Sequence, residues 1–251
     1  DPDPDLTLGE LLRRGRYGRR FVEHYIVPMG AAVWSAGAEA MDSFPAVFFV
    51  RFFSNHGMLS LRDRPVWRTV VGGSKAYLEP LARPFRDRIH LAAPVQSAQR
   101  DGTGVQLHIG GPGGPEKQDA HKRRFDRVVF ATHADITLRI LQDADERERG
   151  LLAAFPYTPN DAVLHTDSSV MPRRRRAWAA WNYHLGLPGV DGQEVAVTYN
   201  MNILQGLDAP EQLLVSLNQT DRIDPAKILR RMRYDHPHFT PEGLKQRRHL
   251  A

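Results

Sequence analysis

The residues of this chain that could contact a ligand are mainly aromatic. A run from Phe44 to Phe53 holds five phenylalanines, and His56 follows it in the turn-like segment "SNHG". The segment "WAAWNYH" adds Trp178, Trp181 and Tyr183. Because side chains alternate along a strand, Trp181 and Tyr183 share one face and Trp178 lies on the other. These patterns predict the wall of an apolar pocket, with burial in the core as the alternative. The pocket candidates are Phe48, Phe52, His56, Trp181 and Tyr183.

Covalent and metal chemistry have few candidates in this sequence. The chain has no cysteine, which excludes disulfide bonds, thiolate metal ligands and a cysteine nucleophile and favours a reducing compartment. The pair His236 and His238 lacks further ligands at a spacing typical of a metal site. We therefore expect no bound metal.

A run of four arginines suggests a second kind of site. It stands between a proline and an aromatic segment, in a chain of net charge +5, and consists of Arg173, Arg174, Arg175 and Arg176. Nucleic-acid recognition needs a basic face, and no familiar nucleic-acid motif accompanies the run. A solvated loop is the simpler interpretation, and a loop that binds anionic lipid or nucleic acid is the alternative.

Length and composition are those of an ordinary soluble protein. The chain has 251 residues, of which 41% are hydrophobic and 25% are charged, enough for one large domain or two smaller ones. The opening "DPDPDLTLGELL" lacks the features of a signal peptide, and no segment approaches the roughly 20 apolar residues of a membrane span. These observations predict a cytoplasmic protein.

The elements that must position the candidate residues change in character along the chain. Residues 6–36 alternate helical periodicity with glycine and proline, which predicts short helices joined by tight turns. In "TVVGGSKAYLEPLARPF" a Gly-Gly turn leads, through Ser74 as N-cap, into a helix interrupted by proline. Three strands are predicted next, "RIHLAAPVQSAQR", "GVQLHIG" and "FDRVVFAT", joined by the hairpin loops "DGTG" and "GGPGGPEK". The apolar run "VVF" is typical of a strand covered on both faces.

The second half of the chain predicts helices followed by a sheet. Residues 136–157 have a helical pattern. Four strand-like segments follow, "DAVLHTDSSVMP", "RAWAAWNYHL", "EVAVTYNMNIL" and "QLLVSLNQT", which predict an antiparallel sheet. The tail from Asp224 predicts turns and a basic helix fragment, with no closing element.

The stretch from Val70 to Asp135 resembles the middle of the flavin-containing amine oxidoreductase superfamily, which includes monoamine oxidases, phytoene desaturases and protoporphyrinogen oxidases. The shared pattern is a Gly-Gly-Ser turn, a helix, a strand at Pro-Val, a meander, and an apolar strand ending in Ala-Thr. The flanking "NHGMLSLRDRPVWRTVVGGS" and "YTPNDAVLHTDSSVMPRRRRAWAAWNY" are similar to a bacterial branch described as NAD/FAD-binding or amine-oxidase-like. The resemblance implies an α/β fold, α+β in part. Residues 72–135 would form an incomplete FAD/NAD(P)-binding Rossmann-like domain, and residues 1–71 and 136–251 a substrate domain of helices and antiparallel sheet.

The resemblance also implies a cofactor and a reaction. Main-chain groups of Val95 would bind the adenine of FAD, and Ala131 and Thr132 would line the cofactor where the chain crosses between domains. The implied activity is that of an FAD-dependent oxidoreductase acting on a largely apolar amine, lipid or isoprenoid-type substrate, with no catalytic residue assigned.

Two features of the family are not found in these residues. The G-x-G-x-x-G turn that holds the pyrophosphate is absent from the sequence, as is the closing segment near the flavin ring. We therefore expect the chain alone to bind FAD poorly and to be inactive. The alternative function is a non-catalytic module that binds anionic lipid or nucleic acid.

Overall fold

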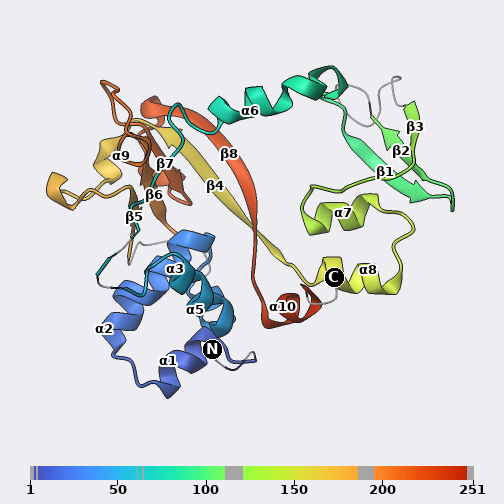
Figure 1. Cartoon of the computed structure of the whole chain (residues 1–251). Helices are drawn as coiled ribbons and strands as arrows, with labels where there is room; N and C mark the ends of the chain where they lie inside the picture. Colours follow the sequence, from blue (N-terminus) through green and yellow to red (C-terminus); the bar gives the residue numbers. More distant parts are fainter. Residues whose placement is uncertain are drawn as a thin grey trace. The chain divides into compact units, whose positions relative to one another are not determined.

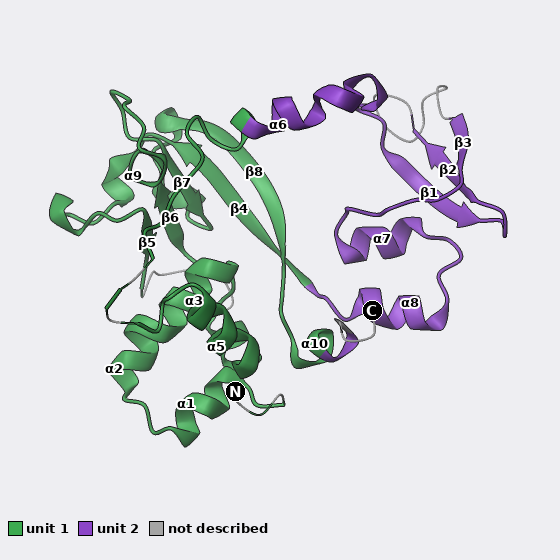
Figure 2. Cartoon of the chain, viewed as in Figure 1, with its two compact units in different colours: residues 1–76, 157–244 green, residues 77–156, 245–251 purple. Residues whose placement is uncertain are grey.

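The computed structural model describes residues 3, 5–60, 62, 63, 65–110, 121–185 and 195–247. The chain forms two compact units (Figures 1 and 2). Unit 1 comprises residues 1–76 and 157–244, and unit 2 comprises residues 77–156 and 245–251. The units divide the chain at 76 and 156, whereas the sequence-based division falls at 71 and 135. The assignment of residues 72–135 to a cofactor domain stays a prediction.

The first 55 residues of unit 1 form short helices. Thr7 begins the first of them with a capping box, in which its side chain accepts a hydrogen bond from the Glu10 amide and Glu10 accepts one from the Thr7 amide. The predicted short helices are found at both ends of this region, but residues 19–34 form one continuous helix with a π-helical turn inside it and no tight turn. The helical elements are α1 (Leu8–Arg14), α2 (Arg19–Phe21), a π-helical turn (Val22–Ile26), α3 (Val27–Trp34), α4 (Ala38–Asp42) and α5 (Ala46–Asn55).

The rest of unit 1 is built on a five-stranded antiparallel sheet with strand order β5-β6-β7-β4-β8. The predicted antiparallel sheet is confirmed. Its strands are β4 (Tyr157–His165), β5 (Trp181–Tyr183), β6 (Val197–Asn200), β7 (Leu214–Leu217) and β8 (Ile228–Pro237). Short helices α9 (Met201–Gln205) and α10 (Pro241–Arg247) follow β6 and β8.

Strand β8 corrects the sequence interpretation, which placed turns in this part of the tail. The segment "ILRRMRYDHP" is mostly exposed and rich in arginine, so it has no apolar alternation to reveal a strand. It pairs with β4 from Tyr157↔Pro237 to His165↔Ile228. Charged residues are common on strands at the edge of a sheet, where they discourage pairing with other chains.

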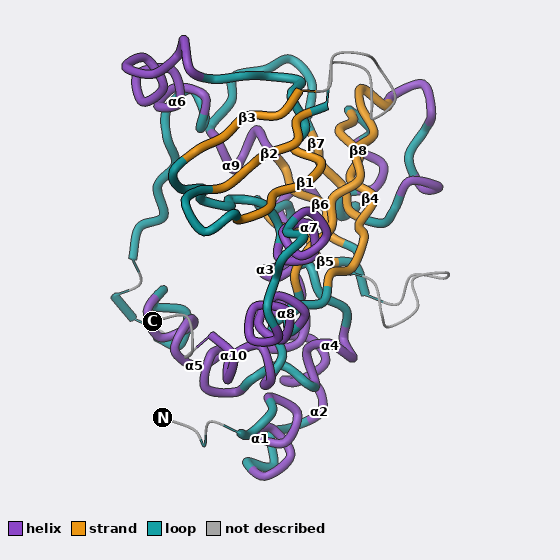
Figure 3. The backbone as a smooth tube through the Cα atoms, turned by 90° about the vertical axis from the view of Figure 1, so that its right-hand side faces the viewer, coloured by secondary structure: helices purple, strands orange, loops and turns teal. Residues whose placement is uncertain are grey.

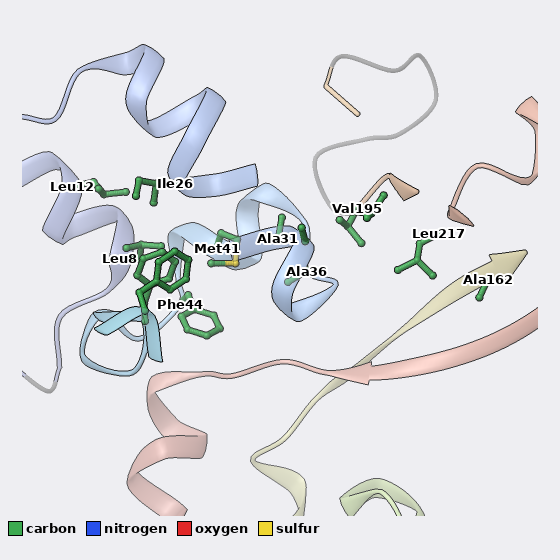
Figure 4. Packing of buried hydrophobic residues seen from close by; sticks show 14 residues of the cluster. Leu8, Leu12, Ile26, Ala31, Ala36, Met41, Phe44, Ala162, Val195 and Leu217 are labelled. Atoms are coloured by element: carbon green, nitrogen blue, oxygen red, sulfur yellow. The ribbon is translucent and has the colours of Figure 1, made fainter. Parts of the chain in front are cut away.

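The sheet of unit 1 separates two apolar clusters. On one face, Ala162, Val197 and Leu217 belong to a cluster with Leu8 of α1 and with Phe44, which lies between α4 and α5. Figure 4 labels Leu8, Phe44, Ala162 and Leu217 of this cluster. On the other face, Val163 and Leu214 pack with Val170, Met171 and Ile223. Neighbouring residues Ala162 and Val163 therefore point to opposite faces, as the two-residue period of a strand requires.

Unit 2 contains a three-stranded antiparallel sheet of β1 (Val95–Arg100), β2 (Val105–Ile109) and β3 (His121–Phe125). The predicted "DGTG" hairpin is confirmed, because the Asp101 amide donates to the Gly104 carbonyl and Gly102 has a φ of 81°. The predicted "GGPGGPEK" loop, apart from Gly110, lies outside the described residues.

The prediction of a strand at "FDRVVFAT" is wrong beyond Phe125. The third strand is the basic segment "HKRRF", and residues 126–132 lie outside any helix or strand. Val128 and Phe130 pack on the small core of Ala98, Leu107 and Ile109, while Val129 is 91% exposed. A strand needs a hydrogen-bonding neighbour, and the described residues provide none for this segment.

Helices complete unit 2. The predicted helix with an internal proline is α6 (Lys75–Ala82), which contains Pro80 and continues as a 3₁₀-helix over Arg83–Arg88. The predicted helical stretch after residue 135 forms α7 (Ala134–Ile140) and α8 (Glu146–Ala153). Helix α7 lies beside β1, and the Gln142 amide donates to the Ala98 carbonyl (Figure 3). In the described part of the chain, no helix has both the length and the apolar character needed to cross a membrane.

Candidate functional site

Of the residues predicted to contact a cofactor, Val95 packs on one small core of unit 2, and Ala131 and Thr132 directly follow a segment that packs on the same core. Val95 begins β1 and packs against the cluster of Ala98, Leu107 and Ile109. Val128 and Phe130 pack against the same cluster, which brings the segment before Ala131 close to the start of β1. The pairing of β1 with β2 is irregular between Val95 and Ser97, so the regular ladder is interrupted at the predicted contact.

The connection between the apolar segment and α7 is a compact elbow. The hydroxyls of Thr132 and Thr137 are hydrogen-bonded at 2.7 Å, and the Thr137 amide donates to the His133 carbonyl at 2.8 Å. Thr137 is buried, whereas Ala131 and Thr132 are exposed. The elbow thus fixes the direction of the chain and leaves two small side chains at the surface.

This arrangement fits one part of an FAD site. Ala131 and Thr132 are small and exposed, so a planar ligand can approach their main chain. Gly72 and Gly73 both have positive φ, at 81° and 75°, in the turn before α6. A pyrophosphate also needs converging amides at the start of a helix, and the sequence has no G-x-G-x-x-G turn to supply them. The residues present therefore leave room for part of the cofactor but not for its pyrophosphate, and the assignment of Val95, Ala131 and Thr132 stays a prediction.

The predicted substrate residues lie in unit 1, at its main core. Three of the five phenylalanines, Phe44, Phe49 and Phe53, are at most 3% exposed, so they belong to the core rather than to a pocket wall. Phe48 and Phe52 are half-buried on α5. The cavity beside Phe44 and Phe239 holds only about 20 Å³, which is space for one water molecule.

Phe52 and His56 form an aromatic column at the edge of this core. The two rings stack at 4.0 Å between centroids, and His56 stacks on Trp67 at 6.1 Å. Trp34 also contacts Phe52, with 4.9 Å between the ring centroids. His56 Nδ1 lies 2.7 Å from the Phe52 carbonyl oxygen, which identifies Nδ1 as the protonated nitrogen and leaves Nε2 as an acceptor.

The aromatic residues of the sheet lie as the alternation predicts. Tyr183 packs on the helical core, and Trp178 packs on the opposite cluster, where its indole N–H donates to the Pro172 carbonyl at 2.7 Å. Trp181 meets Tyr199 edge-on at 5.7 Å. Burial raises the pKa of Tyr183, so it keeps its proton and can donate a hydrogen bond. Phe48, Phe52 and Tyr183 thus surround one core, although their role in substrate binding stays a prediction.

A buried polar network crosses the other face of the same sheet, and sequence reasoning missed it. His165 Nε2 lies 2.9 Å from Ser216 Oγ, and Ser216 Oγ lies 2.8 Å from Thr198 Oγ1. Thr198 Oγ1 in turn lies 3.1 Å from His184 Nε2. The Asp167 amide donates to His165 Nδ1, so Nε2 carries the proton and donates to Ser216. His165 in this tautomer cannot take a proton from the serine. The network is structural, and only the alternation of polar and apolar residues in β6 and β7 hinted at it.

Burial also lowers the pKa of both histidines of this network. It lowers the pKa of His165, and it lowers the pKa of His184 to about 4, with a further contribution from Arg222. Both rings are therefore neutral at physiological pH. Neutral rings can each offer one donor and one acceptor to the buried hydroxyls.

The remaining candidates lie apart from these groups. The four-arginine run is exposed and leads into a 3₁₀ turn at Arg175–Ala177, where Arg175 lies over the Trp178 ring at 5.1 Å. His236 Nδ1 is 3.0 Å from the side-chain Nδ2 of Asn160. Within the described ranges, no group of three or more His, Asp or Glu residues is placed to hold a metal ion.

Comparisons with known proteins agree on the fold. No protein-family model matches the sequence, and no curated protein does. Among solved structures, a CLA-producing fatty acid isomerase from P. acnes has a TM-score of 0.62 at 18% identity, covering 97% of this chain and 57% of that chain. A double mutant of putrescine oxidase has a TM-score of 0.61 at 13% identity, and the match covers 99% of this chain and 60% of that chain. Cyclohexylamine oxidase from Brevibacterium oxydans IH-35A has a TM-score of 0.57 at 14% identity, and the match covers 95% of this chain and 57% of that chain.

These matches run along nearly the whole chain, which spans less than two thirds of each matched protein. They confirm the resemblance found in the sequence at the level of the fold. The chain has the mixed helix and antiparallel-sheet fold of the flavin amine oxidase structures.

Proposed function

We propose that this chain is the central part of an FAD-dependent oxidoreductase of the amine-oxidase type. The observation that carries the proposal is the match of at least 95% of the chain to two amine oxidases and a fatty acid isomerase. The packing of Val95 on the same small core as Val128 and Phe130, just before Ala131 and Thr132, is in keeping with the resemblance, which implies that Val95 contacts the adenine and that Ala131 and Thr132 line the cofactor.

The rest of the cofactor site would come from residues outside these 251. The chain spans 57% to 60% of the matched proteins. The pyrophosphate turn is the part that its sequence lacks. In a Rossmann-like site this turn supplies the converging amides that hold the phosphates, so FAD bound without it would be held weakly.

The proposed substrate is a largely apolar amine or lipid. The matched proteins are named for putrescine, cyclohexylamine and a fatty acid. In this chain the half-buried Phe48, Phe52 and Tyr183 surround an aromatic core, and His56 Nε2 is the nearest acceptor for a polar head group. FAD, when bound, supplies the redox chemistry, and these side chains would bind and orient the apolar part of the substrate.

The proposal is tested with the chain produced together with the residues that flank it in its gene. We expect a yellow protein with flavin absorbance, and bleaching of that absorbance when cyclohexylamine is added without oxygen. Linoleate serves as the lipid probe under the same conditions. A colourless protein that takes up no added FAD would overturn the proposed function. A flavoprotein that neither probe changes would retain the cofactor assignment and contradict the substrate class.

A further inference from the structure

The helical part of unit 1 carries an exposed aromatic stripe between arginines. Tyr17, Phe21 and Tyr25 stack in series, with 5.5 Å between centroids at each step. They are 52%, 41% and 38% exposed, which is unusual for three adjacent large rings. We call this surface the aromatic–arginine face, and it consists of Tyr17, Phe21, Tyr25, Arg14, Arg16 and Arg20.

The stripe is the outer side of an amphipathic helix. Helix α2, the π-helical turn and α3 run without a break from residue 19 to residue 34. Ile26 is buried in the main core and Val22 packs against it, whereas Phe21 and Tyr25, each one position earlier, lie on a neighbouring, exposed side, and Tyr17 precedes the helix. Figures 1 and 3 show α1 and α2 at the end of unit 1 away from its sheet. The face is therefore free of cover from the described part of unit 1.

The charges around the stripe are positive after internal pairing. Arg13 pairs with Asp42, and Arg19 pairs with Glu23, each at 2.8 Å. Arg14, Arg16 and Arg20 are exposed, and the structure pairs none of them with a carboxylate of the residues it describes. Three exposed arginines thus lie within three residues of one of these rings in the sequence.

Arg16 also occupies a strained backbone position. Its φ is 50°, a left-handed conformation that costs a residue with a side chain roughly 1 kcal/mol relative to glycine. Neighbouring Gly15, by contrast, has an ordinary φ of −75°. An arginine kept where a glycine would be more stable suggests that its charge has a role at this surface.

We propose that the aromatic–arginine face docks on an anionic lipid surface. Aromatic side chains settle at the boundary between head groups and acyl chains, and nearby arginines attract anionic lipids. Single-stranded nucleic acid, the other anionic partner, binds aromatic residues by stacking bases on free ring faces. Here Phe21 stacks with both Tyr17 and Tyr25, so part of the ring area that bases would need is already used within the stripe.

Vesicle binding with a charge-matched pair of variants tests the proposal. The first variant is Arg14→Gln, Arg16→Gln and Arg20→Gln, and the second is Arg173→Gln, Arg174→Gln and Arg176→Gln. Both remove three positive charges. On phosphatidylserine-containing vesicles we expect the first to bind at least about tenfold more weakly than the parent chain, and the second to differ by about twofold at most. Phosphatidylcholine vesicles should bind little of any of them. Equal losses of affinity for phosphatidylserine-containing vesicles in the two variants, or a larger loss for the second, would overturn the proposal.

The variant Arg16→Gly separates an effect on vesicle binding from an effect on the stability of the fold. Glycine relieves the positive φ, so this variant should unfold at the same or a higher denaturant concentration than the parent chain. It should nevertheless bind phosphatidylserine vesicles more weakly, by several-fold. Unchanged vesicle binding would contradict a role for this arginine at the membrane.

The absence of cysteine allows the docked surface to be located directly. Gly18→Cys places a unique thiol beside the stripe, and Gly150→Cys places one on α8. A side chain added at either glycine meets no atom within 4 Å. An environment-sensitive dye on residue 18 should shift to the blue with phosphatidylserine vesicles, and the dye on residue 150 should not. No shift at residue 18, binding to single-stranded RNA instead of vesicles, or a dimer held through this face would overturn the proposal.

Discussion

At the scale of single residues, Arg100 connects the parts of unit 2. Its guanidinium donates to Asp143 at 2.8 Å, to the Asp143 carbonyl at 2.7 Å and to both oxygens of Glu148, at 2.7 and 2.9 Å. These hydrogen bonds join β1 to the loop after α7 and to α8. They also hold the pKa of Asp143 and of Glu148 below their ordinary values.

Replacing Arg100 by glutamine should lower the free energy of unfolding at pH 7 by roughly 1 kcal/mol, since the arginine side chain is 42% exposed and solvent screens the pairs. Both carboxyl groups have a lower pKa in the folded state. Their contribution is therefore complete above about pH 5 and is lost as the pH falls through their folded pKa values. The difference between variant and parent should shrink at about pH 3. Urea titrations followed by circular dichroism measure it, with Arg139→Gln, which loses a single exposed pair, as control. A difference that is the same at both pH values would refute this account.

Val95 is the residue at which the cofactor assignment can be tested alone. The proposed contacts are made by its main chain, so Val95→Ala should weaken FAD binding by the longer protein only slightly. Val95→Pro removes the N–H and should weaken it about tenfold. Proline is tolerated at the first position of a strand, so folding should survive. Equal FAD affinity of the two variants, measured by calorimetry, would count against the assignment.

At the scale of elements, α5 divides its phenylalanines between core and surface. Phe53 is 1% exposed and stacks on Phe49 at 4.0 Å, whereas Phe52 is half-buried and stacks on His56. Phe53→Ala should lower the free energy of unfolding by about 3–5 kcal/mol, because it leaves a cavity. Phe52→Ala should lower the free energy of unfolding by less than half that amount. It should instead raise the KM of the complete enzyme. The fluorescence of Trp34, which lies beside both rings, reports the unfolding. Similar losses of stability in both variants, with KM unchanged, would remove Phe52 from the substrate site.

The elements also show where sequence reasoning reaches its limit. The capped helices and the apolar strands of unit 1 follow from local signals, because side-chain periodicity and capping residues act over a few positions. Strand β8 and the segment 126–132 do not. The first is a strand because β4 pairs with it, and the second is not a strand because the described residues offer no neighbour. The network around His165 also depends on pairing, since Thr198 and Ser216 meet only across the sheet.

At the scale of the whole molecule, unit 1 is assembled from distant parts of the sequence. Its main core joins Leu8 and Phe44 near the start of the chain to Val195, Val197 and Leu217 (Figure 4). The residues of unit 2 lie between these parts in the sequence. The order of elements alone did not predict this pairing, because the contacts join residues that are far apart in the sequence.

The central claim is that this chain carries the adenine side of an FAD site whose phosphate-binding part lies outside it. The measurement that tests it most directly compares the FAD affinity of the 251-residue chain with that of the longer protein, by calorimetry under identical conditions. Adenine hydrogen bonds at Val95 and close approach at Ala131 and Thr132, set against the entropy of association, support a dissociation constant on the order of millimolar or weaker for the chain. The longer protein should bind about a thousandfold more tightly, at roughly micromolar or below. A micromolar constant for the 251-residue chain, or equally weak binding by both, would contradict the account.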